Sequence, residues 1–456
     1  MRKQYLIMVI FVLVAVLSVA AAQPPNTPPA IGEVTPEPDS GNLLDRSDNP
    51  TYVALENTEI PIRDRVDLAR RINGVTDIEP TPDAPPQWQL GDRQTFWASN
   101  LDSSVFQVEA ELRAIGEHIY IWVEVGGRVS DNAVRNIAES FDTLVYDQVR
   151  ELWGSEALPG IDNDPRIYAL MAHNLGSGTA AYFASDHSLP SEIVPNSNEH
   201  EMFFINLDAG AFVTNGQSAI SVLAHEFQHM IRNNIDTNEH SWLDEGFSAF
   251  TEVYAIYQGD TSYANYYLSA PYTQLNTWTE LGNTAPHYGG SALFVSYFFQ
   301  RYGLEGLNAW STEPLDGLPG LNHVLLEMGE PGVDEFFADW AVANYIQESA
   351  YAPIHGYDFY NDRQLQQPYL EGRATSLPYE AQDSAAQYST HYYRIEELNG
   401  VSLLDISFEI PPTVRLINLD SPTQTPIWYS NRADNSDTRL TRAFDLRNTS
   451  EATLNY

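Results

Sequence analysis

The chain has 456 residues, of which 43% are hydrophobic and 12% aromatic, enough for two or three domains of ~100–200 residues each. Its formal net charge is −39, with 23 basic residues against 62 acidic ones, which disfavours nucleic acid and anionic membranes as partners because both are negatively charged. The absence of cysteine excludes disulfides, thiol catalysis and thiolate metal sites, so a metal ion would need histidine and carboxylate ligands.

The first 22 residues are typical of a secretory signal peptide. Arg2 and Lys3 precede an apolar run over residues 6–19, and alanines at positions 20–22 provide a cleavage signal. The alternative is a transmembrane anchor, but a span needs ~20 apolar residues and this run is shorter. We therefore expect a secreted, extracellular protein with no stable membrane association after residues 1–22 are removed.

Residues 23–86 are predicted to form a proline-rich linker. Six prolines lie within residues 23–41, and four more follow at positions 80, 82, 85 and 86. This composition favours extended, solvated backbone. Residues 61–72 have the pattern of one amphipathic helix, and the whole segment could serve as a pro-segment of a secreted hydrolase.

Residues 87–378 are predicted to form an α+β domain, because strands come first and helices follow. Alternating or apolar runs predict strands at residues 105–112, 118–125, 166–172 and 202–207. Helical spacing predicts helices at residues 131–152, 217–233, 242–258, 289–302, 321–328 and 333–347. A flexible loop at residues 176–183 could run into an edge strand and offer backbone groups to an extended peptide.

Residues 379–456 are predicted to form a β-sandwich-like module. Strand patterns occur at residues 386–398, 401–410 and 414–417, separated by proline and by Asn-Gly. So few strands are unable to close a sandwich core, and the final residues again have a strand pattern. We therefore expect this module to be incomplete at Tyr456.

Residues 221–234 read SVLAHEFQHMIRNN, which places His225 and His229 on one face of a helix, one turn apart. Two imidazoles so placed can bind one Zn²⁺. Zinc lowers the pKa of a bound water to ~7, and Glu226 lies between the histidines, where it can accept that proton as general base. The alternative is a pair of histidines on an ordinary solvated helix.

The next helix supplies a third candidate ligand. Glu245 stands in the segment SWLDEGFSAF, 16 residues after His229, among apolar residues where an unpaired carboxylate would be costly. A catalytic zinc takes three protein ligands and keeps one position open. Glu252, two helical turns further on, could accept a hydrogen bond from a ligand histidine, although a solvated position is equally compatible with the pattern. His240 is an alternative third ligand.

These two segments, HEFQH and WLDEGFSAF, resemble the gluzincin zinc metallopeptidases. The resemblance implies a zincin-like fold, zinc bound by His225, His229 and Glu245, and catalysis by Glu226. Glu252 matches a glutamate that the family carries seven residues after its third ligand. The gap between the motifs is slightly shorter than in gluzincin aminopeptidases, which favours the smaller secreted peptidases that resemble hyicolysin.

The metzincin pattern HExxHxxGxxH is excluded, because Arg232 and Ile235 stand where it requires glycine and histidine. Residues 427–437, 440–446 and 452–454 resemble the start of the β-module in immune inhibitor A-like secreted peptidases.

The segment APHYGGSALF, residues 285–294, starts another predicted helix. Tyr288 matches a tyrosine that donates a hydrogen bond to the oxyanion in gluzincin aminopeptidases, and His287 is the competing donor. Loss of one such donor typically costs ~3 kcal/mol of transition-state stabilisation. Residues 160–164 (GIDND) could bind Ca²⁺, but a solvated acidic turn is the favoured interpretation.

The sequence therefore predicts a secreted zinc metallopeptidase acting on proteins or peptides. One alternative is a non-enzymatic extracellular binding or surface protein that keeps a peptidase-like fold. Another is a zinc hydrolase that acts on a non-peptide bond.

Overall fold

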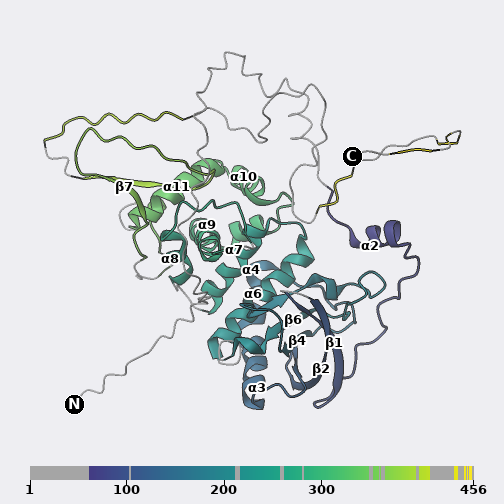
Figure 1. Cartoon of the computed structure of the whole chain (residues 1–456). Coiled ribbons are helices and arrows are strands. Elements are labelled where there is room, and N and C mark those ends of the chain that lie inside the picture. Colours follow the sequence, from purple (N-terminus) through teal and green to yellow (C-terminus); the bar gives the residue numbers. More distant parts are fainter. Residues whose placement is uncertain are drawn as a thin grey trace, which may run out of the picture. The chain divides into compact units, whose positions relative to one another are not determined.

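The computed structural model describes residues 61–101, 104–210, 216–256, 261–279, 282–348, 353–358, 360, 365–396, 400–410, 436–439, 446–447, 449 and 451–453. Within these residues the fold is α+β, with a mixed sheet followed by a helical subdomain (Figure 1). This is the zincin-like arrangement that the sequence predicts. Residues 1–22, predicted to be a signal peptide, and most of the predicted linker at residues 23–86 lie outside the described residues.

The main sheet has six strands in the order β1-β2-β3-β4-β6-β5. β3, β4 and β6 are parallel to one another, and the remaining neighbours are antiparallel. β4 and β6 are buried along their whole length because both faces of the sheet are covered. The strands are Arg93–Asn100 (β1), Ser104–Ile115 (β2), Ile119–Glu124 (β3), Ile167–Ala172 (β4), Ala181–Phe183 (β5) and Met202–Asn206 (β6).

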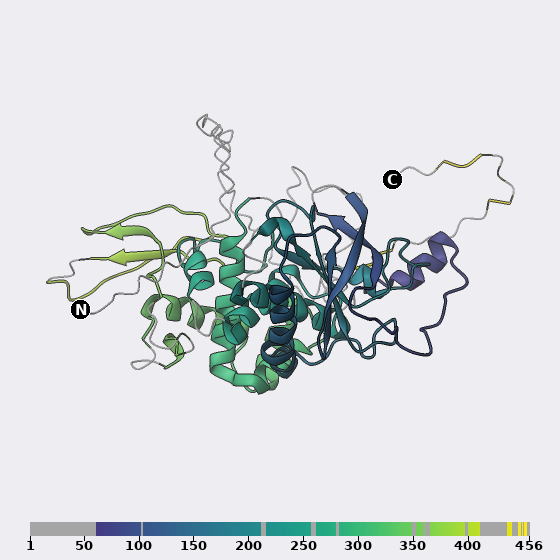
Figure 2. The same cartoon turned by 90° about the horizontal axis from the view of Figure 1, so that it is seen from below.

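Helices cover one face of this sheet and then continue into the helical subdomain. α6 packs on β5 and β6 and, on its other side, against α7, which in turn packs against α9 (Figures 1 and 2). One continuous apolar core joins the sheet face to all these helices. The helices are Asp131–Ser140 (α3), Tyr146–Trp153 (α4), Gly216–Ile235 (α6), Ser241–Thr251 (α7), Ser262–Leu268 (α8), Ala285–Ser311 (α9), Gly317–Glu327 (α10) and Val333–Ile346 (α11).

Most predicted elements of this domain are confirmed, with three differences. β1 and α8 carried no clear periodic pattern in the sequence and were not predicted. The predicted helices at residues 131–152 and 242–258 each contain a π-helical turn, at Phe141–Val145 and at Glu252–Ile256. The helix predicted at residues 289–302 begins earlier, at Ala285, and ends as predicted at a break at Gly303, whose φ of 66° a glycine adopts without strain; α9 continues beyond this break as a second, unpredicted helical segment.

The C-terminal region agrees with the prediction only in part. Leu370–Ala374 (β7) and Tyr392–Ile395 (β8) pair in parallel. The strand predicted at residues 401–410 is wrong: this stretch forms no strand, and its apolar side chains at 403, 406, 408 and 410 are exposed. Within the described residues, this segment has no neighbouring strand with which to pair. The strand predicted at 414–417 lies outside the described residues, as do most of the positions that carry the immune inhibitor A-like pattern.

The amphipathic helix predicted at residues 61–72 is found as a short α-helix, Arg65–Leu68 (α2), continued by a π-helical turn, Ala69–Asn73. Asp64 caps the first turn by accepting a hydrogen bond from the Asp67 backbone. Ala69 packs against Ile193 and Val194, so the apolar side of this segment rests on the loop between β5 and β6. None of the helices among the described residues combines the length and apolar character needed to cross a bilayer.

Candidate metal centre

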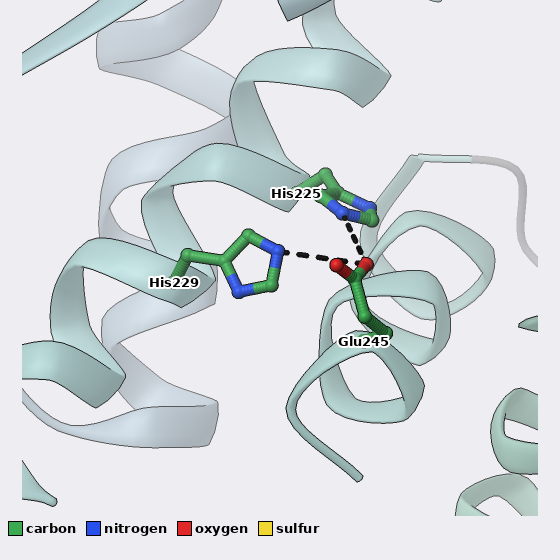
Figure 3. A group of neighbouring side chains, drawn as sticks. All are labelled: His225, His229 and Glu245. Atoms are coloured by element: carbon green, nitrogen blue, oxygen red, sulfur yellow. Dashed lines mark ion pairs between the residues drawn. The ribbon is translucent and has the colours of Figure 1, made fainter. Parts of the chain in front are cut away.

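The predicted ligand residues meet where α6 faces α7. His225 and His229 project from α6 with their ring centroids 4.9 Å apart. Glu245 projects from α7, and one of its carboxylate oxygens lies 3.3 Å from Nε2 of His225 and 3.7 Å from Nε2 of His229 (Figure 3). One potential ligand atom from each residue lies within 4.8 Å of the other two. Among the described residues this is the group that could hold a metal ion.

A buried arginine fixes the turn between the two helices. Arg232 is only 4% exposed, and it forms ion pairs with Asp236 and Glu239 and donates to the backbone carbonyl of Ser311. Glu239 also accepts from the backbone N–H of Gly317 at 2.8 Å. These bonds tie the α6–α7 turn to α9 and α10, and so set the separation of the two ligand-bearing helices.

His240, the alternative third ligand, lies elsewhere. It is the N-cap residue of α7, and its imidazole stands directly beside Gly317 at the start of α10. It is not part of the His225–His229–Glu245 group.

A carboxylate at the end of α7 holds the ring of His225. Oε1 of Glu252 lies 2.8 Å from Nδ1 of His225, and the hydroxyl of Tyr263 donates to the same oxygen at 2.8 Å. The other oxygen accepts a short hydrogen bond from Ser221. Glu252 is therefore buried and fully hydrogen-bonded, rather than solvated. Sequence reasoning missed Tyr263, which has no motif of its own.

A second carboxylate holds the ring of His229. Oδ2 of Asp244 lies 3.0 Å from Nδ1 of His229. Sequence reasoning missed Asp244, although a signal existed: a histidine that binds metal usually donates its other N–H to a carboxylate or carbonyl. Asp244, directly before Glu245 in the chain, was available for that task.

The carboxylates shape the charge of the site. Burial acts to lower the pKa of His225, but hydrogen bonds with Glu245 and Glu252 raise it to about 10. Burial also acts to lower the pKa of His229. The negative charges of Asp244 and Glu245 outweigh this effect, so the pKa of His229 lies well above its usual value. Burial acts to raise the pKa of Glu245, but the two imidazoles outweigh it and hold this pKa well below its usual range. The surroundings thus favour positive charge at this point, whether on imidazole or on a metal ion.

The arrangement fits a zinc ion. Both Nδ1 atoms are occupied by carboxylates, so each Nε2 is left to face Glu245. Oε2 of Glu245 is buried and has the two Nε2 atoms as its close neighbours, at 3.3 and 3.7 Å. A buried carboxylate is costly unless positive charge stands beside it. Two imidazole nitrogens and one carboxylate oxygen are a donor set typical of catalytic zinc.

Glu226 lies on the same helix, between the two histidines. Its side chain is 6% exposed, and burial raises its pKa, while His225 and His229 act to lower it. The backbone of Phe183 forms a hydrogen bond with its carboxylate. Since Phe183 ends β5, the outermost strand of the sheet, this contact places the edge strand predicted near residues 176–183 next to Glu226.

The two candidate oxyanion donors lie in the first turn of α9. Tyr288 is directed at the carboxylates: burial and then Glu245 raise its pKa far above its usual value. Nδ1 of His287 lies 2.9 Å from the backbone carbonyl of Thr277, an atom that can only accept. His287 is therefore committed through this nitrogen to the loop before α9, and burial lowers its pKa.

A pocket of about 380 Å³ opens beside the group. Its lining includes His229, Asp244 and Glu245, together with Phe183 of β5 and Trp278. A substrate side chain could enter here next to the ligands.

The turn at residues 160–164 differs from its prediction. Asp162 and Asp164 are buried, so the expectation of a solvated acidic turn is wrong. Oδ2 of Asp162 accepts from Tyr168 at 2.9 Å and lies 2.9 Å from Nδ1 of His200. Oδ2 of Asp164 accepts from Tyr120 at 2.9 Å. The carboxylate oxygens that were candidate calcium ligands are thus hydrogen-bonded to protein side chains.

No protein-family model matches the chain. The chain is similar to the neutral metalloprotease ShpI of Staphylococcus hyicus, with 24% identity over 302 residues. The match covers 59% of this chain and 66% of that protein, just under two thirds of its length. The fold, the His225–His229–Glu245 group and this similarity together make the chain a distant relative of a metalloprotease.

Proposed function

We propose that the chain is a secreted zinc peptidase in which His225, His229 and Glu245 bind the metal. The observation that carries the proposal is the convergence of both Nε2 atoms on one carboxylate oxygen of Glu245. The similarity to a neutral metalloprotease supports the choice of a peptide bond as substrate. Protein or peptide substrates are the partners this function requires.

The roles of the surrounding residues follow from their positions. When bound, zinc would polarise the peptide carbonyl and acidify a water molecule. Glu226 then takes the proton of the attacking water and delivers it to the leaving amine. Tyr288 donates a hydrogen bond to the carbonyl oxygen as that oxygen gains negative charge. Glu252 and Asp244 keep the two imidazoles oriented.

The substrate backbone can pair with the edge of the sheet. β5 is the last strand of the sheet and is bonded through Phe183 to Glu226. An extended peptide added alongside β5 would lie across the ligands. We assign this catalytic unit to residues 87–378, preceded by a signal peptide at 1–22 and a linker or pro-segment at 23–86, with a β-rich module at 379–456.

The test is the metal content and proteolytic activity of the purified chain. We expect one zinc per chain and hydrolysis of protein substrates that a chelator abolishes and zinc restores. Glu245→Ala should weaken zinc binding sharply; unchanged metal content would move the third ligand to another residue. Zinc-dependent hydrolysis of glycans or esters without proteolysis would identify a non-peptide hydrolase. No hydrolysis on a broad panel would favour an extracellular binding protein.

A further inference from the structure

The loop before α9 is held at two nearby positions, Leu275 and Thr277. Leu275 is buried, and its backbone N–H donates to the carbonyl of Tyr388 at 3.0 Å. Two residues later, the carbonyl of Thr277 accepts from Nδ1 of His287 at 2.9 Å. Because a carbonyl cannot donate, Nδ1 carries the hydrogen. The backbone at Thr277 is thereby held against the first turn of α9.

The next residue, Trp278, lies against Tyr288. Their rings meet edge to face, with centroids 4.8 Å apart and planes at 85°. On other sides the Tyr288 ring has Tyr263 at 6.2 Å and His225 at 6.3 Å. The indole of Trp278 is the nearest of these three rings, and it also lines the pocket beside the ligands.

We propose that Trp278, held in place by the His287–Thr277 hydrogen bond, is a positioning residue that aims the hydroxyl of Tyr288 at the reacting carbonyl. This inference rests on the proposed peptidase function and adds two residues to it. His287 then acts through the loop, and it does not compete with Tyr288 for the oxyanion. Trp278 has a second task as a wall of the pocket.

Kinetics separate these two tasks. Tyr288→Phe should lower kcat by ~100-fold, the effect typical of losing one oxyanion donor. Trp278→Ala should lower kcat by roughly 3- to 10-fold, the range that an aromatic edge contact supports. In the Tyr288→Phe background, Trp278→Ala should change kcat by less than about 2-fold, since the hydroxyl it aims is gone. Any change in KM should persist in both backgrounds, because the pocket wall is lost in both.

Three further variants complete the cycle. Trp278→Phe should recover most of the kcat lost in Trp278→Ala, because it keeps a ring at that place. His287→Ala should resemble Trp278→Ala and be non-additive with it. Trp97→Ala is the matched control: Trp97 is a partly buried indole on β1, and its removal should leave kcat unchanged. Equal effects of Trp278→Ala in the wild-type and Tyr288→Phe backgrounds would overturn the proposal while leaving the peptidase function intact.

A measurement without turnover tests the same contact. A fluorinated tyrosine placed at position 288 gives one ¹⁹F resonance. In the metal-free protein we expect Trp278→Ala and His287→Ala to shift that resonance and change its width, and Trp97→Ala to leave it in place. If Trp278→Ala changes neither the position nor the width of this resonance, the proposal is overturned, even if the chain hydrolyses no peptide.

Discussion

Asp244 and His229 form a carboxylate–imidazole pair, with Oδ2 of Asp244 3.0 Å from Nδ1 of His229. The other ligand histidine has an equivalent partner, since Glu252 lies 2.8 Å from Nδ1 of His225. Both partner carboxylates and Glu245 lie in α7 or at its C-terminal end. Each imidazole is therefore oriented from the same helix that supplies the third ligand.

Asp244→Ala should raise the dissociation constant for zinc by ~10–100-fold, the usual effect of removing a partner of a ligand histidine. Asp244→Asn should have a smaller effect, because an amide oxygen can still accept from Nδ1. A competition titration with a zinc chelator measures both. Asp208→Ala is a matched control, since Asp208 pairs with Nδ1 of the exposed His173 at 2.7 Å. Equal zinc affinity in Asp244→Ala and wild type would remove Asp244 from the site.

Glu226→Gln should keep zinc and the fold while losing turnover by ~10²–10⁴-fold or more. Glutamine has nearly the same size but cannot act as a base at neutral pH. Zinc content and melting temperature are measured beside the rate of peptide hydrolysis. Proteolysis that persists in a preparation free of contaminating protease would contradict the general-base role.

Tyr288→Phe should lower kcat far more than it changes KM, because the hydrogen bond it removes forms mainly in the transition state. His287→Gln should have a smaller effect on kcat, since Nδ1 of His287 is already bonded to Thr277. Steady-state kinetics on one peptide substrate give kcat and KM for both variants and for the wild type. A larger loss in His287→Gln than in Tyr288→Phe would reverse the assignment of the two residues.

His187 should make the protein less stable as the pH falls from about 6.5 to about 4. Its side chain is buried, with Nδ1 accepting from the backbone of Asn198 at 3.1 Å, and burial, followed by the nearby His200, lowers its pKa to about 4. In this window the unfolded chain binds a proton at this residue and the folded chain does not, so stability rises with pH. The contribution is on the order of 3 kcal/mol at most, at ~1.4 kcal/mol per pKa unit.

Urea unfolding between pH 4.5 and 7.5 measures this slope. His187→Gln keeps an acceptor for the Asn198 N–H and removes the titrating group, so its free energy of unfolding should depend less steeply on pH. An identical slope in both proteins would show that His187 does not cause it.

The sequence predicted the residues that local spacing places together. His225 and His229 are one turn apart on any helix, and the apolar residues around Glu245 indicated that it would be buried. Asp244 and Tyr263 could not be found in this way, because the carboxylate or hydroxyl that reaches a ligand depends on how α6, α7 and α8 pack. The same limit applies to strands: the alternation at residues 401–410 was clear, but alternation alone does not provide a neighbouring strand.

The division of labour between helices has a consequence for how this site could fail or evolve. The three candidate ligands and both orienting carboxylates come from residues 225–252, on α6 and α7. The proposed oxyanion donor, Tyr288, and the residue proposed to position it, Trp278, come from α9 and the loop before it. Metal capture and oxyanion stabilisation are therefore separable properties of the fold. A descendant of this chain could drift in the α9 region and become a metal-binding protein without catalysis, whereas drift in α7 would erase both properties at once.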